Sequence, residues 1–122
     1  MISIIDDDRS VREAVKSLIR SLGYEAVTFA SAEEYLGADG AHDSECVITD
    51  VQMPGGMTGI DLQDRLIADG YRRPIIFMSA LSAEVAGATA ASRFLRKPFS
   101  DERLIDCLDQ ALNDPAPNSW RF

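Results

Sequence analysis

Three aspartates, a serine and a lysine are the side chains of this sequence best suited to chemistry, because they follow short apolar runs. They are Asp6, Asp7, Asp50, Ser79 and Lys97. Grouped carboxylates bind hard cations such as Mg²⁺ or Mn²⁺, which prefer oxygen ligands. A carboxylate can also attack phosphorus to give an acyl phosphate, a step that depends on positioning and charge neutralisation. These residue types therefore indicate a divalent-cation site that contains a carboxylate able to act as a nucleophile, if the fold brings them together.

The charges of such a site can be balanced from the sequence. Asp6, Asp7 and Asp50 would place three negative charges in one crevice. Lys97 and one Mg²⁺ would together supply three positive charges. Crowded carboxylates disfavour ionisation, so we expect at least one raised pKa in the absence of metal.

Taken singly, each of these residues also has a purely structural interpretation. Asp50 suits a turn or a helix cap, Ser79 suits a cap of the segment after it, and Lys97 suits the surface. The acidic run of residues 6–8 suits the start of a helix, which Asp8 could cap. Only the combination of these residues favours a functional site over these separate interpretations.

The residues around Asp50 predict a strand that ends in a turn. Cys46 to Thr49 is a short, mostly apolar, β-favouring run, which is typical of a strand buried on both faces of a sheet. Pro54 lacks an N–H and Gly55 tolerates positive φ, so the strand cannot continue through the residues that follow. Asp50 is therefore expected where the backbone leaves the sheet.

Strands and helices are expected to alternate along the whole chain. The expected strands are residues 2–5, 24–29, 46–49, 74–78 and 93–96, and the expected helices are residues 9–22, 31–36, 60–70 and 100–112. This alternation predicts an α/β fold with a doubly wound parallel sheet covered on both faces. The functional crevice of such a sheet lies beyond the carboxyl ends of its strands. The polar side chains named above follow four of the five strands, and only the second strand, near Phe29, lacks one.

Length and composition indicate a single globular domain, residues 1–113, followed by a tail or the start of a linker at 114–122. Twelve Lys and Arg against twenty Asp and Glu give a net charge of −8, which argues against direct nucleic-acid contact. Cys46 and Cys107 suit reduced core positions rather than a disulfide. With no signal peptide and no run of membrane-spanning length, we expect a cytoplasmic chain without membrane contact.

Four short motifs, in order and at strand ends, carry a family resemblance. They are Asp6-Asp7, the block from Asp50 to Pro54, Ser79-Ala80, and Lys97-Pro98-Phe99. Over nearly its whole length the chain resembles the receiver domain of bacterial two-component response regulators, the CheY-like family. The resemblance implies a five-stranded parallel sheet in the order 2-1-3-4-5. It also implies a signalling switch that assists its own phosphorylation and dephosphorylation, rather than an enzyme.

The resemblance assigns roles around the acceptor. It implies that Asp50 accepts a phosphoryl group from a histidine kinase or a phosphotransfer protein. It implies that Asp6, Asp7, Asp50 and the backbone carbonyl of Gln52 hold Mg²⁺ or Mn²⁺. It further implies that Lys97 contacts the phosphoryl oxygens.

The remaining motif residues would couple phosphorylation to a change of shape. The resemblance implies that Ser79 contacts the phosphoryl group, that small Ala80 leaves a path to the acceptor, and that Phe94 is the switch aromatic. Phe94 would equally suit an ordinary core position. The resemblance also implies a cis bond before Pro98. The output partner stays open, and a homodimer formed on phosphorylation is one arrangement that the family allows.

Two other function classes fit the sequence less well. A phosphatase-like hydrolase with an aspartate nucleophile would need a second carboxylate where Gln52 stands, as its general acid. A flavodoxin-like cofactor binder would need a phosphate-cradling loop after the first strand, where residues 6–8 are instead acidic. For both alternatives, the sequence lacks a group that the chemistry requires.

The sequence departs from the family in the connection before the fifth strand. Only seventeen residues, positions 80 to 96, separate Ser79 from Lys97. Because the fifth strand is expected at residues 93–96, residues 80–92 must form the whole crossover. The part of this segment that could form a helix is short and contains Gly87, which disfavours a helix. We therefore predict a shortened fourth helix. The Gly55-Gly56 turn is also one residue longer than the family usually has.

Overall fold

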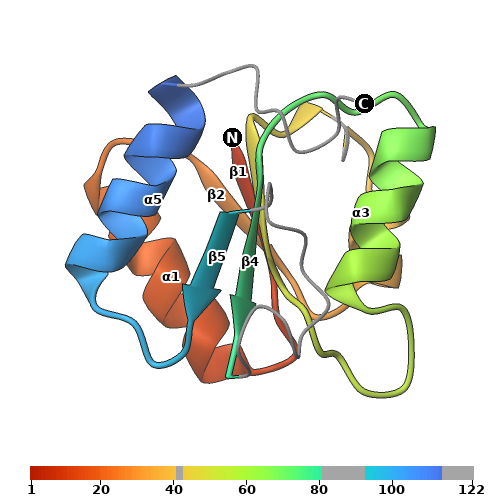
Figure 1. The fold of residues 1–122 in the computed structure, drawn as a ribbon, viewed down its shortest axis with the longest axis horizontal. Coiled ribbons are helices and arrows are strands. Elements are labelled where there is room, and N and C mark those ends of the chain that lie inside the picture. Colours follow the sequence, from red (N-terminus) through yellow and green to blue (C-terminus); the bar gives the residue numbers. More distant parts are fainter. Residues whose placement is uncertain (41–42, 81–92, 114–122) are drawn as a thin grey trace.

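The computed structural model describes residues 1–40, 43–80 and 93–113, in which a parallel sheet lies between two layers of helices (Figure 1). The strands are β1 (Ile2–Ile5), β2 (Ala26–Phe29), β3 (Cys46–Asp50), β4 (Ile75–Ser79) and β5 (Arg93–Arg96). The helices are α1 (Arg9–Ser21), α2 (Ala32–Leu36), α3 (Gly59–Ala68) and α5 (Asp101–Asn113). None of the helices within these ranges is long and apolar enough to cross a membrane.

The five strands are all parallel and follow the order β2-β1-β3-β4-β5, which confirms the predicted topology. The strand that carries Asp50 is therefore central. In its register, Asp50 lies beside Met78 of β4, and Thr49 lies beside Ile5 of β1. The carboxyl ends of β1, β3 and β4 consequently meet at one edge of the sheet.

Alternate residues of the central strands pack into two separate hydrophobic cores, one on each face of the sheet. Val47 and Phe77 pack into a cluster with α2 and α3, whereas Ile48 and Met78 pack into a cluster with α1 and α5. This division follows from the pleat, which points successive side chains to opposite faces. Figure 1 shows the consequence, with α1 and α5 on one side of the sheet and α3 on the other.

The ends of α1 are set by residues next to the helix in the sequence. Asp8 is its N-cap, and its Oδ1 accepts the amide hydrogens of Ser10 and Val11 at 2.8 and 3.4 Å. Gly23, just beyond the helix, has a φ of 94°, a conformation that favours glycine. The expected capping role of Asp8 is thus confirmed.

The two helices on the other face also begin at hydroxyl caps. Ser31 caps α2 by accepting the amide of Glu34, while the Glu34 carboxylate reaches the amide of Ala30 rather than that of Ser31. Thr58 and Asp61 form a complete capping box at the start of α3. These caps fix where the loops before both helices end.

Element boundaries shifted slightly from those expected. The second strand begins at Ala26 rather than Tyr24, because the amide of Tyr24 still bonds the Ile19 carbonyl at the end of α1. The fourth strand runs from Ile75 to Ser79, one residue later than expected, since Pro74 has no N–H to donate to the sheet. The predicted shortened fourth helix lies in residues 81–92, outside the described residues. So does the predicted tail, 114–122, and the domain boundary at 113 stays a prediction.

Candidate functional site

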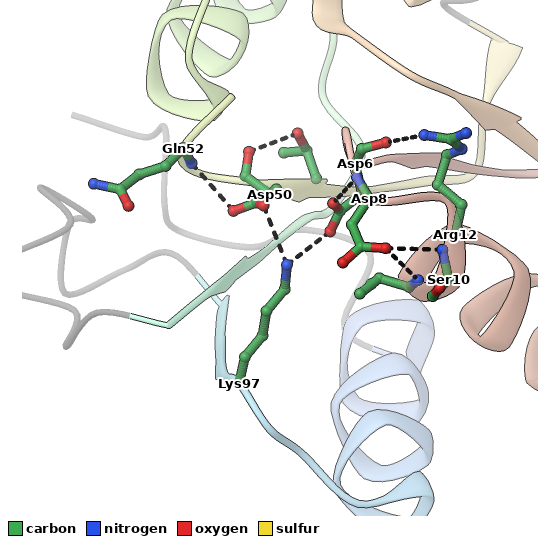
Figure 2. Close-up of polar contacts among 9 residues, drawn as sticks. Asp6, Asp8, Ser10, Arg12, Asp50, Gln52 and Lys97 are labelled. Atoms are coloured by element: carbon green, nitrogen blue, oxygen red, sulfur yellow. Dashed lines mark hydrogen bonds and ion pairs between the residues drawn. The ribbon is translucent and has the colours of Figure 1, made fainter. Parts of the chain in front are cut away.

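The sheet brings Asp6, Asp50 and Lys97 together, as their positions at strand ends predicted. Asp6 follows β1, Asp50 ends β3 and Lys97 follows β5. Figure 2 shows the ammonium group of Lys97 between the two carboxylates. Its Nζ donates to Asp6 Oδ2 at 2.8 Å and to Asp50 Oδ2 at 3.1 Å. One lysine therefore bridges two aspartates that lie far apart in the sequence.

This bridge is largely shielded from solvent. Asp6 is 0% exposed and Asp50 is 7% exposed. The Lys97 side chain is 21% exposed, so it lies at the mouth of the site. Buried carboxylates need charged or hydrogen-bonding partners, and Lys97 supplies one to each.

Backbone amides hold the second oxygen of each buried carboxylate. The amide of Asp8 donates to Asp6 Oδ1 at 2.8 Å, and the amide of Gln52 donates to Asp50 Oδ1 at 3.1 Å. Each amide lies two residues after its aspartate, as expected where a strand turns into a loop. These bonds, visible in Figure 2, leave both carboxylates with a defined orientation.

Arg12 is a site residue that sequence reasoning missed. Its Nη1 donates to the backbone carbonyl of Asp6 at 2.7 Å, from one turn into α1 (Figure 2). The bond ties the start of α1 to the end of β1. Its only sequence signal is a position one helical turn beyond Asp8, the cap of the helix.

Burial and charge together shift the pKa values of the site. Burial raises the pKa of Asp6, and the Asp50 charge adds to this, although the Lys97 and Asp8 hydrogen bonds act against it. Burial by itself would lower the pKa of Lys97, but the two aspartates outweigh it and the pKa is raised. The expected raised carboxyl pKa is thus confirmed, with burial rather than crowding as its main cause.

The acidic cluster has the donor set of a hard cation. Asp6, Asp7 and Asp50 each offer a carboxylate oxygen, and these oxygens all lie within 4.8 Å of one another. Two of the carboxylates are buried, and Asp7 is exposed to solvent. With Lys97 as the cation bridging two of them, the four side chains retain a net charge of −2. Oxygen ligands and excess negative charge both fit Mg²⁺ or Mn²⁺.

Ser79 and Ala80 adjoin this cluster through β4. Ser79 is 1% exposed, and its carbonyl accepts the amide hydrogen of Lys97 at 2.7 Å. This bond fixes the backbone of Lys97 against the end of β4. Ala80 is exposed and lines a groove beside Lys97 and Pro98. The Lys97–Pro98 peptide bond is cis, as the resemblance implied.

Phe94 is the second residue of β5 and is half-buried. It pairs with Phe77 in the sheet and packs against the core cluster on the α3 side. That position satisfies the ordinary core interpretation and also places the ring on the strand that leads to Lys97.

Comparison with known proteins agrees with this geometry. Residues 2–109 match the response regulator receiver domain family. The chain is 40% identical to the response regulator protein TmoT of Ectopseudomonas mendocina over 119 residues, 92% of this chain and 52% of TmoT. It is 35% identical to the transcriptional regulatory protein FixJ of Bradyrhizobium diazoefficiens over 121 residues, 95% of this chain and 58% of FixJ.

Solved structures give the same result. The response regulator StyR superimposes with a TM-score of 0.76 at 37% identity, covering 92% of this chain and 58% of StyR. A response regulator receiver protein from Burkholderia phymatum gives 0.73 at 39% identity, covering 95% of this chain and 97% of that protein. The chain spans about half the length of the curated relatives it matches. It belongs to the response regulator receiver domain family, the phosphoacceptor switches of two-component signal transduction.

Proposed function

We propose that Asp50 is the phosphoacceptor of this receiver domain and that a histidine kinase or a phosphotransfer protein is the donor. The observation that carries the proposal is the convergence of Asp6 and Asp50 on the Lys97 ammonium at the carboxyl edge of the sheet. Asp50 ends the central strand and is oriented by the Gln52 amide. A carboxylate held in this way is prepared for attack before the donor arrives.

The transfer needs little proton chemistry. An Asp50 carboxylate oxygen forms a bond to phosphorus while the bond from phosphorus to the donor imidazole nitrogen breaks, and the electron pair stays on that nitrogen. Lys97 would move from its carboxylate partners toward the transferred oxygens and neutralise part of their charge. Ser79 would donate a hydroxyl hydrogen bond to the phosphoryl group, and Ala80 would leave the approach open.

The acidic cluster would hold the cation. Asp6, Asp7, Asp50 and the backbone carbonyl of Gln52 are the proposed ligands of Mg²⁺ or Mn²⁺. The cation would supply the positive charge that Lys97 alone cannot, because the four side chains sum to −2. Its binding should therefore be strongest when the carboxylates are ionised.

Phosphorylation would then change partner binding. We propose that Ser79 and Phe94 form the switch. Ser79 is the last residue of β4, and Phe94 of β5 lies beside Phe77, which also belongs to β4. The new charge on Asp50 would favour one of two arrangements of these residues. The chain would act as a cytoplasmic switch that assists its own phosphorylation and dephosphorylation, with an output partner or a homodimer as its readout and no direct contact with nucleic acid or membrane.

Intact-mass measurement after treatment with acetyl phosphate tests the acceptor. In Mg²⁺, the wild type should gain one phosphoryl group that survives acid and is released by hydroxylamine. The Asp50→Asn variant should gain none. Addition of EDTA in place of Mg²⁺ should suppress the adduct in the wild type, because the cluster would then lack its cation.

A matched control uses another aspartate after β3. Asp64→Asn removes the same charge from an exposed position on α3, and this variant should be phosphorylated like the wild type. An undiminished adduct in Asp50→Asn would rule out Asp50 as the acceptor. An adduct formed equally well in EDTA would rule out the role of the cation.

A further inference from the structure

The loop between β3 and α3 is held from outside by a side chain of α2. Glu33 lies in the first turn of α2 and is exposed to solvent. Its Oε2 accepts the amide hydrogen of Met57 at 2.8 Å, across 24 residues of sequence. The bond joins α2 to the loop that begins immediately after Asp50.

Two other contacts fix the same loop from inside. At its base, the amide of Gly59 donates to the carbonyl of Val51 at 2.9 Å. Near its start, Met53 is 5% exposed and belongs to the core cluster on the α3 side. Between Met53 and Met57 the backbone passes through two glycines, which have the greatest conformational freedom of any residue.

The second of these glycines makes room for the Glu33 carboxylate. A Cβ atom built on Gly56 would lie 2.6 Å from Glu33 Oε2, closer than non-bonded atoms approach. Gly55 has a φ of +83°, which favours glycine for a different reason. The hydrogen bond from Met57, together with the Glu33 amide, also lowers the pKa of Glu33, so its carboxylate is ionised at neutral pH.

We propose that Glu33 is a positioning residue for the acceptor site, which clamps the β3–α3 loop at Met57 so that its Gln52 end is set for binding a divalent cation. The proposal rests on the proposed function. Gln52 links the loop to the site, because its amide donates to Asp50 Oδ1. Without the clamp, the Gly55–Gly56 segment gains freedom that cation binding must then remove.

The size of the effect follows from the bond that is lost. One ordinary intramolecular hydrogen bond contributes about as much as a two- to tenfold change in an equilibrium constant. We therefore expect Glu33→Ala to bind Mg²⁺ about two- to tenfold more weakly than the wild type. Glu33→Gln should stay near the wild type, because its amide oxygen can still accept the Met57 hydrogen.

Two further variants separate the clamp from a simple change of charge. Glu34→Ala removes the same charge from the next residue of α2, whose carboxylate contacts Ala30 and not the loop. Its Mg²⁺ affinity should match the wild type. Gly56→Ala should weaken Mg²⁺ binding by pushing the Glu33 carboxylate away from Met57. In a Glu33→Ala background, Gly56→Ala should have no additional effect.

The experiment is a calorimetric Mg²⁺ titration of each variant, with amide hydrogen exchange at Met57 measured in parallel. Exchange at Met57 should accelerate in Glu33→Ala and in Gly56→Ala but not in Glu34→Ala. Equal loss of Mg²⁺ affinity in Glu33→Ala and Glu34→Ala would overturn the clamp, as would unchanged affinity in Glu33→Ala. A full additional effect of Gly56→Ala in the Glu33→Ala background would overturn it too.

Failure of the proposed function would look different. A wild type that does not bind Mg²⁺ at all contradicts the cation site, and with it the assigned role of the clamp. Exchange at Met57 would then still report whether Glu33 restrains the loop.

Discussion

At the scale of single residues, the site depends on Lys97. Two buried carboxylates share its ammonium group, so each of them has a charged partner even without a metal ion. The pKa of Lys97 is raised in the folded protein. The contribution of Lys97 to the free energy of unfolding is therefore fully present at any pH below the ordinary lysine pKa, and it is lost as the pH rises through the raised pKa. The metal-free protein should therefore lose stability in strong alkali.

Removing the ammonium group should make the free energy of unfolding depend on pH on the acidic side of neutrality. In metal-free Lys97→Met, we expect a loss of about 3 kcal/mol in the free energy of unfolding at pH 7, because two buried charges lose their partner. The pKa of Asp6, already raised by burial, should rise further. A raised carboxyl pKa means that the folded state holds its proton more tightly than the unfolded state does. The difference in the free energy of unfolding between Lys97→Met and the wild type should therefore shrink as the pH falls toward the ordinary pKa of an aspartate.

Urea denaturation in EDTA between pH 4 and pH 8 measures this difference. Lys16→Met, which removes the same charge from the middle of α1, serves as the control and should differ little from the wild type at any pH. A deficit in Lys97→Met that stays constant over this range would contradict the assignment of Lys97 as the partner of Asp6.

At the scale of elements, the junction between β3 and α3 controls where Asp50 points. Gly59, the first residue of α3, lies directly against the backbone of the strand end. A Cβ atom there would be 2.4 Å from the Asp50 carbonyl oxygen and 3.0 Å from the Val51 Cα. Both atoms belong to the backbone, so neither can move aside without displacing Asp50.

Gly59→Ala should therefore lower the free energy of unfolding by about 1–3 kcal/mol, as overpacking does, and slow phosphorylation of Asp50. Thermal unfolding and the rate of adduct formation measure the two effects. Gly37→Ala is the matched control, because its Cβ would lie 3.4 Å from the nearest atom, an ordinary contact. If Gly59→Ala unfolded at the same temperature as Gly37→Ala, the close packing of Gly59 against the Asp50 backbone would not contribute to stability, and the prediction would be wrong.

At the scale of the whole molecule, the two ends of the sheet differ in their polar contacts. The carboxyl end carries the charged site. At the amino end, the hydroxyls of Ser3 and Ser44 are 2.5 Å apart, and the Tyr71 hydroxyl donates to the Ser44 carbonyl at 2.9 Å. These contacts are buried, and they join β1 to the connections before β3 and β4.

This division predicts that stability and function can be changed separately. Tyr71→Phe should lower the free energy of unfolding by about 1–2 kcal/mol, because it leaves a buried carbonyl without that donor. Its rate of phosphorylation and its Mg²⁺ affinity should equal those of the wild type. Tyr24→Phe, at a half-buried tyrosine after α1, is the control for loss of a hydroxyl. A slower phosphorylation of Tyr71→Phe would show that the two ends are coupled.

The sequence by itself determined the features that depend on local patterns. The alternation of strands and helices follows from hydrophobic periodicity, and the end of β3 at Asp50 follows from Pro54 and the glycines beside it. Because parallel strands carry their carboxyl ends to one edge, the meeting of Asp6, Asp50 and Lys97 could be predicted before any contact was known.

Tertiary structure alone decided which partner each polar group takes. Arg12 reaches the Asp6 carbonyl, Glu33 reaches Met57, and Tyr71 reaches the carbonyl of Ser44. Such contacts depend on rotamers and on how far each helix is shifted along the sheet, and no periodicity in the sequence encodes either. The main cause of the raised Asp6 pKa is tertiary for the same reason, since burial exists only after the helices pack over the strand ends.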